Sequence, residues 1–386
     1  MNGLQELKVL GLTKVDIMDF QVVILAGCEY AGLHPLTPDI PKMLLPIGNK
    51  PLLACVLDML EGLVERFHGP VLIVTPPEFS RSLQAYLDSY VPIHGLNTYE
   101  IVELPVDCKN TMQVLLHLRK AHVRTNLLLV SGDSVMDSEV LRQQLEAYRL
   151  SPCDLSVLLT AKPAEEKPLY ALSSSRIVSI GCEEDGIKVH RALLRQFPSV
   201  SIRSGLSDCY CYLFAYDLLV GMSGKVEGLK GVKRGLVPKL VKHQMDTAFL
   251  KEMGKDKPLV LTYFLVPQGY FATRANTLRS YIDLNLKCCY PFGGKDKKGK
   301  LIPLQPVVLR RTRNNPENIL DNYLRPQAQP PAFIKMISND CIVGVNFIAG
   351  IGSKVVSSVI GRDVRLGAKA SVTQSVVMDG VTIEDE

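Results

Sequence analysis

Residues 20–53, FQVVILAGCEYAGLHPLTPDIPKMLLPIGNKPLL, decide the fold of this chain. Phe20 to Ala26 is a short apolar run, which predicts a buried strand. A glycine-containing turn follows, and then come Pro-Leu-Thr, Pro41-Lys42 and a segment rich in leucine and proline. A strand that runs into such a turn is typical of a nucleotide-binding loop, because glycine lets backbone N–H groups approach phosphate oxygens without a Cβ in the way.

Short apolar runs alternate with longer amphipathic ones after this loop. The predicted strands are 20–26, 70–75, 100–104, 126–131 and 154–160, and the predicted helices are 51–67, 77–90, 111–122 and 138–149. This order predicts an α/β fold, a mostly parallel sheet flanked by helices. Strand-like pieces at 169–173, 208–215 and 259–265, with helical pieces at 234–243 and 276–288, predict that the same sheet continues to residue 291.

The last part of the chain, from Cys341 to Glu386, shows apolar residues at intervals of six or twelve. They are Ile342, Ile348, Ile360, Leu366, Val372 and Met378. Hexapeptide-repeat spacing predicts a left-handed parallel β-helix of two to three coils, in which Lys354 would be an exceptional inward lysine. We expect this β-helix to be incomplete, because the sequence stops in the middle of a repeat.

These patterns together predict four regions. They are an N-terminal extension over 1–19, the α/β domain over 20–291, a connector rich in proline and charge over 292–335, and the β-helix over 336–386. In the α/β domain, ligands are expected at the carboxyl ends of the strands, where the loop after 20–26 and Gly132-Asp133 would lie.

Composition excludes several functional classes. The net charge is +5, Lys and Arg are scattered, and there is no Trp, so we predict no direct nucleic-acid partner. The ten cysteines form no C-x-x-C pair and the seven histidines show no ligand spacing, so we expect free buried thiols and no metal site. No apolar run approaches the length of about 20 residues that a membrane span needs, so we expect no membrane partner and a cytoplasmic location.

The block after the first strand resembles the signature of the sugar-phosphate nucleotidyltransferases, L-x-G-G-x-G-T-R-L-x-P-L-T followed by P-K-x-L-x-P. The matching residues are Leu25, Ala26, Gly27, Leu33, Pro35, Leu36, Thr37, Pro41, Lys42 and Pro46. Asn110-Thr111 stands where that family lines the base and sugar, and Asp133 stands where it has its first metal-binding aspartate. The resemblance therefore implies a vestigial nucleotide-binding site made of Leu25, Ala26, Gly27, Lys42, Asn110, Thr111 and Asp133.

The departures from the family pattern fall where its chemistry is done. Cys28 and Tyr30 replace glycines, Gly32 replaces the arginine, and Thr273 replaces the second metal-binding aspartate. An arginine offers a fixed fork of donors to the phosphates, and losing one such contact costs roughly two to three orders of magnitude in rate. We therefore predict no catalytic residue, no metal and no cofactor.

Purely structural roles for the remaining polar residues also stay open. Lys42 could be a surface lysine after a proline, and Asp133 a turn or helix-cap residue. Glu166-Lys167-Pro168 is similar to the family's sugar-binding E-K-P, but it lies too close to strand 154–160, and we interpret it as a charged loop.

A degraded transferase loop followed by a hexapeptide tail resembles the gamma and epsilon subunits of eukaryotic translation initiation factor 2B. The gamma subunits resemble it more, because residues 41–52 keep their P-K-x-L-L-P-x-G-N-K-P-L pattern. The resemblance implies a non-catalytic subunit of the guanine-nucleotide exchange factor for initiation factor 2. Its partners would be the epsilon and other subunits of factor 2B, and factor 2 itself, in the cytosol.

Two other functions remain open at this point. One is an active sugar-phosphate nucleotidyltransferase similar to the mannose-1-phosphate guanylyltransferases. The other is a sensor that binds a sugar nucleotide in the vestigial pocket without turning it over.

Overall fold

The computed structural model contains the predicted strands and helices, except that the helix predicted over 51–67 ends at Glu61 and is followed by a separate 3-10 turn, Val64–Arg66. It describes residues 20–27, 31–37, 40–90, 99–105, 107–108, 110–162, 166–222, 226, 228–289, 292–295, 301–303, 336–338 and 340–385. The predicted N-terminal extension and most of the predicted connector lie outside these residues, as do Cys28 and Tyr30.

The chain forms two compact units. Unit 1 consists of Met1–Cys28, Leu60–Ser134 and Glu139–Gln268, and unit 2 of Glu29–Met59, Val135–Ser138 and Gly269–Glu386. Each unit is therefore assembled from segments that are distant in the sequence.

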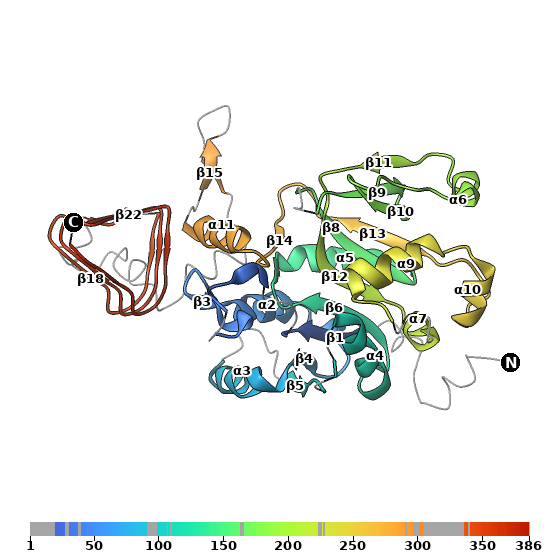
Figure 1. Ribbon diagram of the computed structural model, residues 1–386, viewed down its shortest axis with the longest axis horizontal. Coiled ribbons are helices and arrows are strands. Elements are labelled where there is room, and N and C mark those ends of the chain that lie inside the picture. The colour runs from blue at the N-terminus through green and yellow to red at the C-terminus, as the bar shows by residue number, and fades with distance from the viewer. Residues whose placement is uncertain are drawn as a thin grey trace. The chain divides into compact units, whose positions relative to one another are not determined.

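A ten-stranded sheet forms the centre of unit 1 (Figure 1). Its spatial order is β11 (Ser201–Arg203), β9 (Pro168–Ser173), β10 (Arg176–Cys182), β13 (Leu261–Leu265), β8 (Leu155–Thr160), β12 (Ser207–Phe214), β6 (Asn126–Ser131), β1 (Phe20–Leu25), β4 (Val71–Thr75) and β5 (Tyr99–Glu103). Seven strands run in one direction, and β10, β11 and β12 run in the other. The segment beyond residue 160 therefore completes the same sheet, as predicted.

Helices cover both faces of this sheet, as its apolar strands require. They are α3 (Pro77–Ser89), α4 (Thr111–Ala121), α5 (Ser138–Leu150), α6 (Arg191–Gln196), α7 (Tyr216–Gly221), α9 (Val237–Lys242) and α10 (Thr247–Glu252), with the π-helix η5 (Val232–Leu236) and the 3-10 turn η4 (Val64–Arg66). All six residues of β1 are buried, because a strand covered on both faces must be apolar on both.

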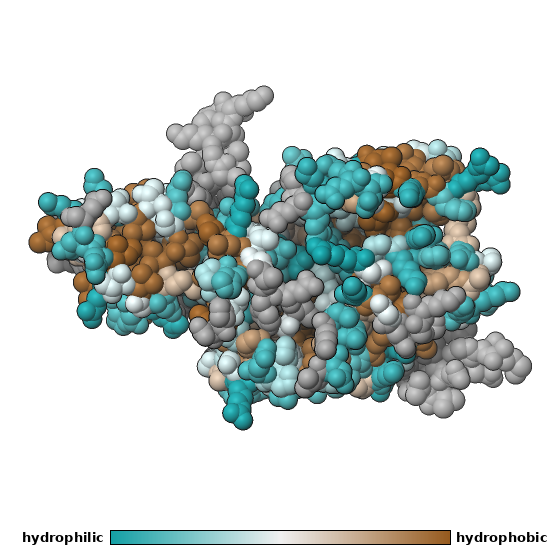
Figure 2. Space-filling model, viewed as in Figure 1, coloured by the Kyte–Doolittle hydropathy of each residue, from teal (hydrophilic) through white to brown (hydrophobic). Residues whose placement is uncertain are grey.

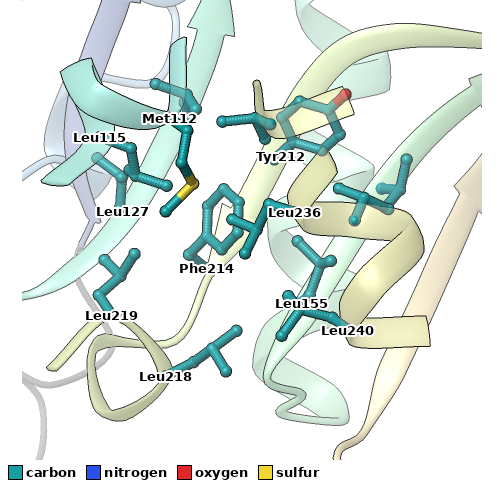
Figure 3. Close-up of a cluster of buried hydrophobic side chains, with 14 of the residues drawn as sticks. Met112, Leu115, Leu127, Leu155, Tyr212, Phe214, Leu218, Leu219, Leu236 and Leu240 are labelled. Atoms are coloured by element: carbon teal, nitrogen blue, oxygen red, sulfur yellow. The ribbon is translucent and has the colours of Figure 1, made fainter. Parts of the chain in front are cut away.

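The main core of unit 1 lies on one face of the sheet (Figure 3). Phe214 and Leu127 of the sheet meet Met112 of α4, Leu219 of α7 and Leu236 of η5 there. On the other face, the ring of Phe20 packs edge-on against the ring of Tyr148 of α5, with their centroids 5.1 Å apart. Alternate side chains of the strands therefore pack into two separate hydrophobic layers, one on each face of the sheet.

Unit 2 contains short elements, the helix α11 (Leu278–Cys289) and a stack of coils. The short elements are η2 (Ala31–Leu33), η3 (Lys42–Leu44), the hairpin β2 (Pro46–Ile47) and β3 (Lys50–Pro51), β7 (Ser134–Met136), β14 (Ala272–Arg274), β15 (Phe292–Lys295) and β16 (Leu301–Pro303). Helix α2 (Leu52–Glu61) runs from unit 2 into unit 1. Asn285 of α11 is fully buried and accepts a hydrogen bond from Gly48 N at 2.9 Å, and Tyr281 donates to Pro46 O at 2.6 Å. These bonds hold α11 on the hairpin.

The last part of unit 2 stacks short parallel strands in three sheets (Figure 1). The strands are β17 (Ile342–Val343), β18 (Ile348–Ala349), β19 (Lys354–Val356), β20 (Val359–Ile360), β21 (Arg365–Leu366), β22 (Ser371–Thr373), β23 (Val376–Val377) and β24 (Thr382–Ile383). Ile342 pairs with Val359, and Val359 pairs with Val376, so each coil takes 17 residues.

Two residues of the predicted repeat, which we expected to face the interior of the coils, are exposed to solvent instead. Ile348 is 57% exposed, because it stands in one outward row with Arg365 while its neighbour Ala349 pairs with Leu366. Lys354 is exposed, and Val355 beside it fills the interior, so the expected inward lysine does not exist. The cause is the length of the coil: it has 17 residues, one fewer than three strict hexapeptides, so the spacing of six is not kept throughout each coil.

Candidate functional site

The carboxyl ends of three neighbouring strands meet at the predicted ligand-binding edge of the sheet. Gly132 N donates to Leu25 O at 2.9 Å, and Ala26 N donates to Val74 O at 2.8 Å. The loop after β1 and the loop that carries Asp133 therefore lie side by side, as expected for a parallel sheet.

Gly27 is a glycine for a reason of packing. A Cβ at this position would stand 2.1 Å from Pro76 Cδ, well inside van der Waals contact. Pro76 directly follows β4, so the turn after β1 fits against the neighbouring strand end only without a side chain. The glycine that matched the transferase signature thus has a structural role in this chain.

Asn110 and Thr111 both make internal hydrogen bonds at the start of α4. The Asn110 side chain accepts from Met112 N at 3.0 Å and from Gln113 N at 3.1 Å, which makes it the N-cap of the helix. Thr111 Oγ1 accepts from Val232 N at 3.0 Å and from the Tyr210 hydroxyl at 2.9 Å. Thr111 therefore joins α4, β12 and η5.

Strand β12 is irregular at this point. Its register against β8 shifts between Asp208 and Tyr212, and Tyr210 has a φ of 53°. Ser134 Oγ, which follows Asp133, donates to Cys209 O at 2.6 Å. The Asp133 loop and the α4 N-terminus therefore both contact the same bulge. Bulges and strained backbones of this kind cluster at functional sites.

A cavity of about 1340 Å³ opens beside this bulge in unit 1. It lies between β8, β9, β10, η5 and α9, and Asp208 reaches it from the bulge. None of the six predicted site residues in unit 1 lines it. The cavity was therefore missed by sequence reasoning, because its walls come from the part of the sheet beyond residue 155.

Charged side chains form one wall of the cavity. Lys233 Nζ donates to Glu166 Oε2 at 2.8 Å, and Arg234 donates to the other oxygen of the same carboxylate. Burial opposes the charge on Glu166, but these two cations outweigh it and lower the pKa of Glu166 to about 2. Glu166 belongs to the segment that we interpreted as a charged loop, and its ion pairs with Lys233 and Arg234 fix its carboxylate on the cavity wall.

Two further polar groups lie on the cavity wall. Asp208 is buried and accepts from Tyr210 N and from the Tyr212 hydroxyl, each at 2.6 Å. Tyr170 is 4% exposed, and burial raises the pKa of its hydroxyl. The cavity thus combines an apolar floor with a few fixed polar groups, a typical composition of small-ligand sites.

The remaining signature residues belong to unit 2. Lys42 starts η3 and is 6% exposed, so the interpretation of Lys42 as a surface lysine is wrong. Thr273 lies in β14. Gly32 lies so close to the backbone that a Cβ would stand 2.3 Å from Asn276 O, and an arginine there would force the chain to move.

Neither a metal cluster nor a membrane-spanning helix is found in the described part of the chain. No group of three or more His, Cys, Asp or Glu side chains there could hold a metal ion, and Asp133 is a buried turn residue. Nine cysteines in that part are free thiols, seven of them buried. No helix among the described residues is both long and apolar enough to cross a membrane.

The fold defines the class of protein first. The chain has a nucleotidyltransferase-like α/β fold. The inositol-1-phosphate CTP transferase from T. maritima shares it at 13% sequence identity with a TM-score of 0.50, covering 69% of this chain and 95% of that one. At that identity the likeness shows the fold alone, and no protein-family model matches the chain.

The sequence comparisons name the relatives more narrowly. The translation initiation factor eIF2B subunit gamma of Dictyostelium discoideum is 25% identical, and the match covers 90% of this chain and 88% of that protein. The gamma subunit of Schizosaccharomyces pombe is 24% identical and covers 75% of this chain and 68% of that protein. The chain is similar to eIF2B gamma subunits over 69–90% of its length, and the resemblance predicted from the degraded loop, residues 41–52 and the hexapeptide tail is confirmed.

Proposed function

We propose that this chain is a non-catalytic subunit of the guanine-nucleotide exchange factor that acts on translation initiation factor 2. The observation that carries the proposal is the similarity to eIF2B gamma subunits over up to 90% of the chain. In the proposed complex the chain pairs with the epsilon subunit and promotes GDP/GTP exchange on factor 2 in the cytosol. Its own site performs no chemistry.

The geometry of the signature residues supports a site without transferase activity. Asn110 and Thr111 are engaged in a helix cap and in a link between elements. Gly27 serves the packing of Pro76, and the backbone at Gly32 leaves no room for the arginine that phosphoryl transfer would need. Side chains that satisfy one another in the fold are poorly placed to bind phosphates at the same time.

The proposal also covers the domain organisation of the chain and its assembly with other subunits. We take the 17-residue coils of residues 336–385 as a left-handed β-helix, and the four predicted regions as the domain organisation. In the proposed complex the chain functions as part of a hetero-oligomer.

Affinity purification tests this proposal directly. The tagged chain is purified from its own cytosol, and the recovered proteins are quantified by mass spectrometry and size exclusion. We expect the other eIF2B subunits in near-equal amounts together with factor 2. Release of a fluorescent GDP from factor 2 should be faster with the complete complex than with a complex that lacks this chain. Recovery of the chain alone would contradict the proposal.

The transferase alternative makes the opposite predictions. An active enzyme would release pyrophosphate from GTP and mannose 1-phosphate, and the near-isosteric variant Asp133→Asn would abolish that release. In our proposal the wild-type chain releases none, and Asp133→Asn leaves GDP exchange by the complex unchanged. A sensor would bind GDP-mannose in isothermal titration calorimetry without turnover, so the same protein preparation separates the three functions.

A further inference from the structure

One edge of the ten-stranded sheet of unit 1 is open. Strand β11 is the first strand in the sheet order, and among the described residues it pairs with β9 alone. All three of its residues, Ser201, Ile202 and Arg203, are exposed. Such an edge presents backbone N–H and C=O groups that a further strand can pair with.

The segment that leads to this edge carries positive charge without compensation. Between Asp185 and Asp208 the sequence holds Lys188, His190, Arg191, Arg195 and Arg203 and no Asp or Glu. All five side chains are exposed. The arginines and the lysine make no ion pair with any described residue, so their charges are available to a partner.

The charges flank the strand on both faces of the sheet. Ile202 pairs with Ala171, which packs with Leu193 of α6, so α6 and its Arg191 and Arg195 lie on that face. Cross-strand partners share a face and neighbours alternate, so Arg203 lies on the opposite face.

Apolar side chains are exposed beside these cations. Ile202 is 59% exposed and Leu194 of α6 is 48% exposed. Figure 2 shows apolar atoms gathered among hydrophilic ones over the region where Figure 1 places β9, β10 and β11. The edge therefore offers hydrogen-bonding groups, charge and apolar contact together.

We propose that the β11 edge binds an extended acidic segment of a partner protein, which adds to the sheet as a further strand. Successive side chains of this segment point to opposite faces, so one set of carboxylates pairs with Arg203. On the other face, further carboxylates pair with Arg191 and Arg195, and an apolar residue covers Ile202. The inference is independent of the exchange function proposed above, because it rests on this surface alone.

The same charges argue against a second copy of this chain as the occupant. Pairing β11 with its own copy would bring Arg203 and the α6 arginines of both copies together, and like charges close to one another on paired strands are destabilising. An acidic segment turns each of these contacts into an attraction. The chemistry of the edge therefore selects for carboxylates.

Fluorescence anisotropy with a labelled peptide tests the proposal. The probe is Glu-Glu-Glu-Ile-Glu-Glu-Glu, which as an extended strand carries glutamates on both faces and its isoleucine on one, and the control probe has lysine in place of each glutamate. We expect the full chain to bind the acidic probe and not the basic one. The triple variant R191E/R195E/R203E should weaken binding at least about tenfold, since each exposed ion pair is replaced by a repulsion. The matched control is Arg81→Glu, an exposed arginine on α3 beside β5 at the opposite edge, which should leave binding unchanged.

Hydrogen exchange separates strand addition from simple charge attraction. Bound acidic peptide should slow the exchange of amides in 201–203, and a peptide N-methylated at alternate residues should lose both the slowing and the affinity. Equal weakening by Arg81→Glu, unchanged exchange in 201–203, or no binding at all would each overturn the proposal. Circular dichroism of the triple variant checks that it is folded, since all three positions are on the surface.

Discussion

Replacing Thr111 with valine should destabilise unit 1, although the two side chains have nearly the same shape. Thr111 Oγ1 accepts hydrogen bonds from Val232 N and from the Tyr210 hydroxyl. Val232 is fully buried and Tyr210 is 8% exposed, so neither donor finds water readily once the oxygen is gone. Valine keeps the volume and replaces the hydroxyl, which accepts both hydrogen bonds, with a methyl group.

The size of the effect follows from the two donors. A buried donor left without a partner costs about 1–3 kcal/mol, and the fully buried backbone N–H of Val232 should lie in the upper part of that range. The Tyr210 hydroxyl is less enclosed and should add about 1 kcal/mol. We expect a loss of about 2–4 kcal/mol, which for a unit of this size lowers its melting temperature by roughly 4–16 °C.

Differential scanning calorimetry of three variants measures this loss. Thr111→Ser keeps the hydroxyl and should stay within about 1 kcal/mol of the wild type, whereas Tyr210→Phe removes one donor and should cost about 1 kcal/mol. In the double-mutant cycle of Thr111→Val with Tyr210→Phe the losses should not add. If Thr111→Val melts with the wild type, or if Thr111→Ser is equally destabilised, the hydroxyl does not join the three elements and the reasoning is wrong.

Three further changes test other parts of the candidate site. Gly27→Ala should destabilise unit 1 by about 1–3 kcal/mol in thermal unfolding, because its Cβ meets Pro76 Cδ, and G27A/P76A should regain part of the loss. Asn110→Ala should cost about 1 kcal/mol through the lost N-cap while Asn110→Asp should not; equal losses in both would rule out a capping role. The pKa of Glu166 is lowered from 4.5 to about 2, so its contribution to stability is complete above about pH 4.5 and vanishes as the pH falls through about 2. The melting-temperature difference between wild type and Glu166→Gln should shrink in that window, and a difference that grows there would contradict the ion pairs.

Regular elements could be predicted from the sequence because their causes are local. The strand predicted over 126–131 is β6 with the same bounds, and helices 77–90 and 111–122 end within one residue of α3 and α4. Burial on one helix face or both strand faces imposes a periodicity that the sequence displays directly. The short elements α6, α7 and α10 and the edge strand β11 went unpredicted, because three to six residues hold too little periodicity to detect. The seven-residue strand β10 was missed as well.

The site residues show a different balance. Sequence matching found the loop after β1 and the start of α4, which the structure places at strand ends and at a helix N-terminus. It could not show that Thr111 is bound to Tyr210, 99 residues away, or that Gly27 is a glycine because of Pro76. Sequence matching also did not identify Glu166 as part of a cavity wall, because the two cations that pair with it lie 67 and 68 residues further along the chain.

What the sequence by itself determined is therefore the nucleotidyltransferase-like fold, the departures of the loop after β1 from the transferase signature, and the similarity to the eIF2B gamma subunits. These depend on periodicity and on residue types at fixed spacing, which a linear chain carries in full. Only the tertiary structure decided what the surviving residues do, where the cavity lies, and that the coils take 17 residues with Lys354 outside. Hydrogen bonds, close packing and register are properties of pairs of residues, and folding chooses those pairs across distances that no local pattern records.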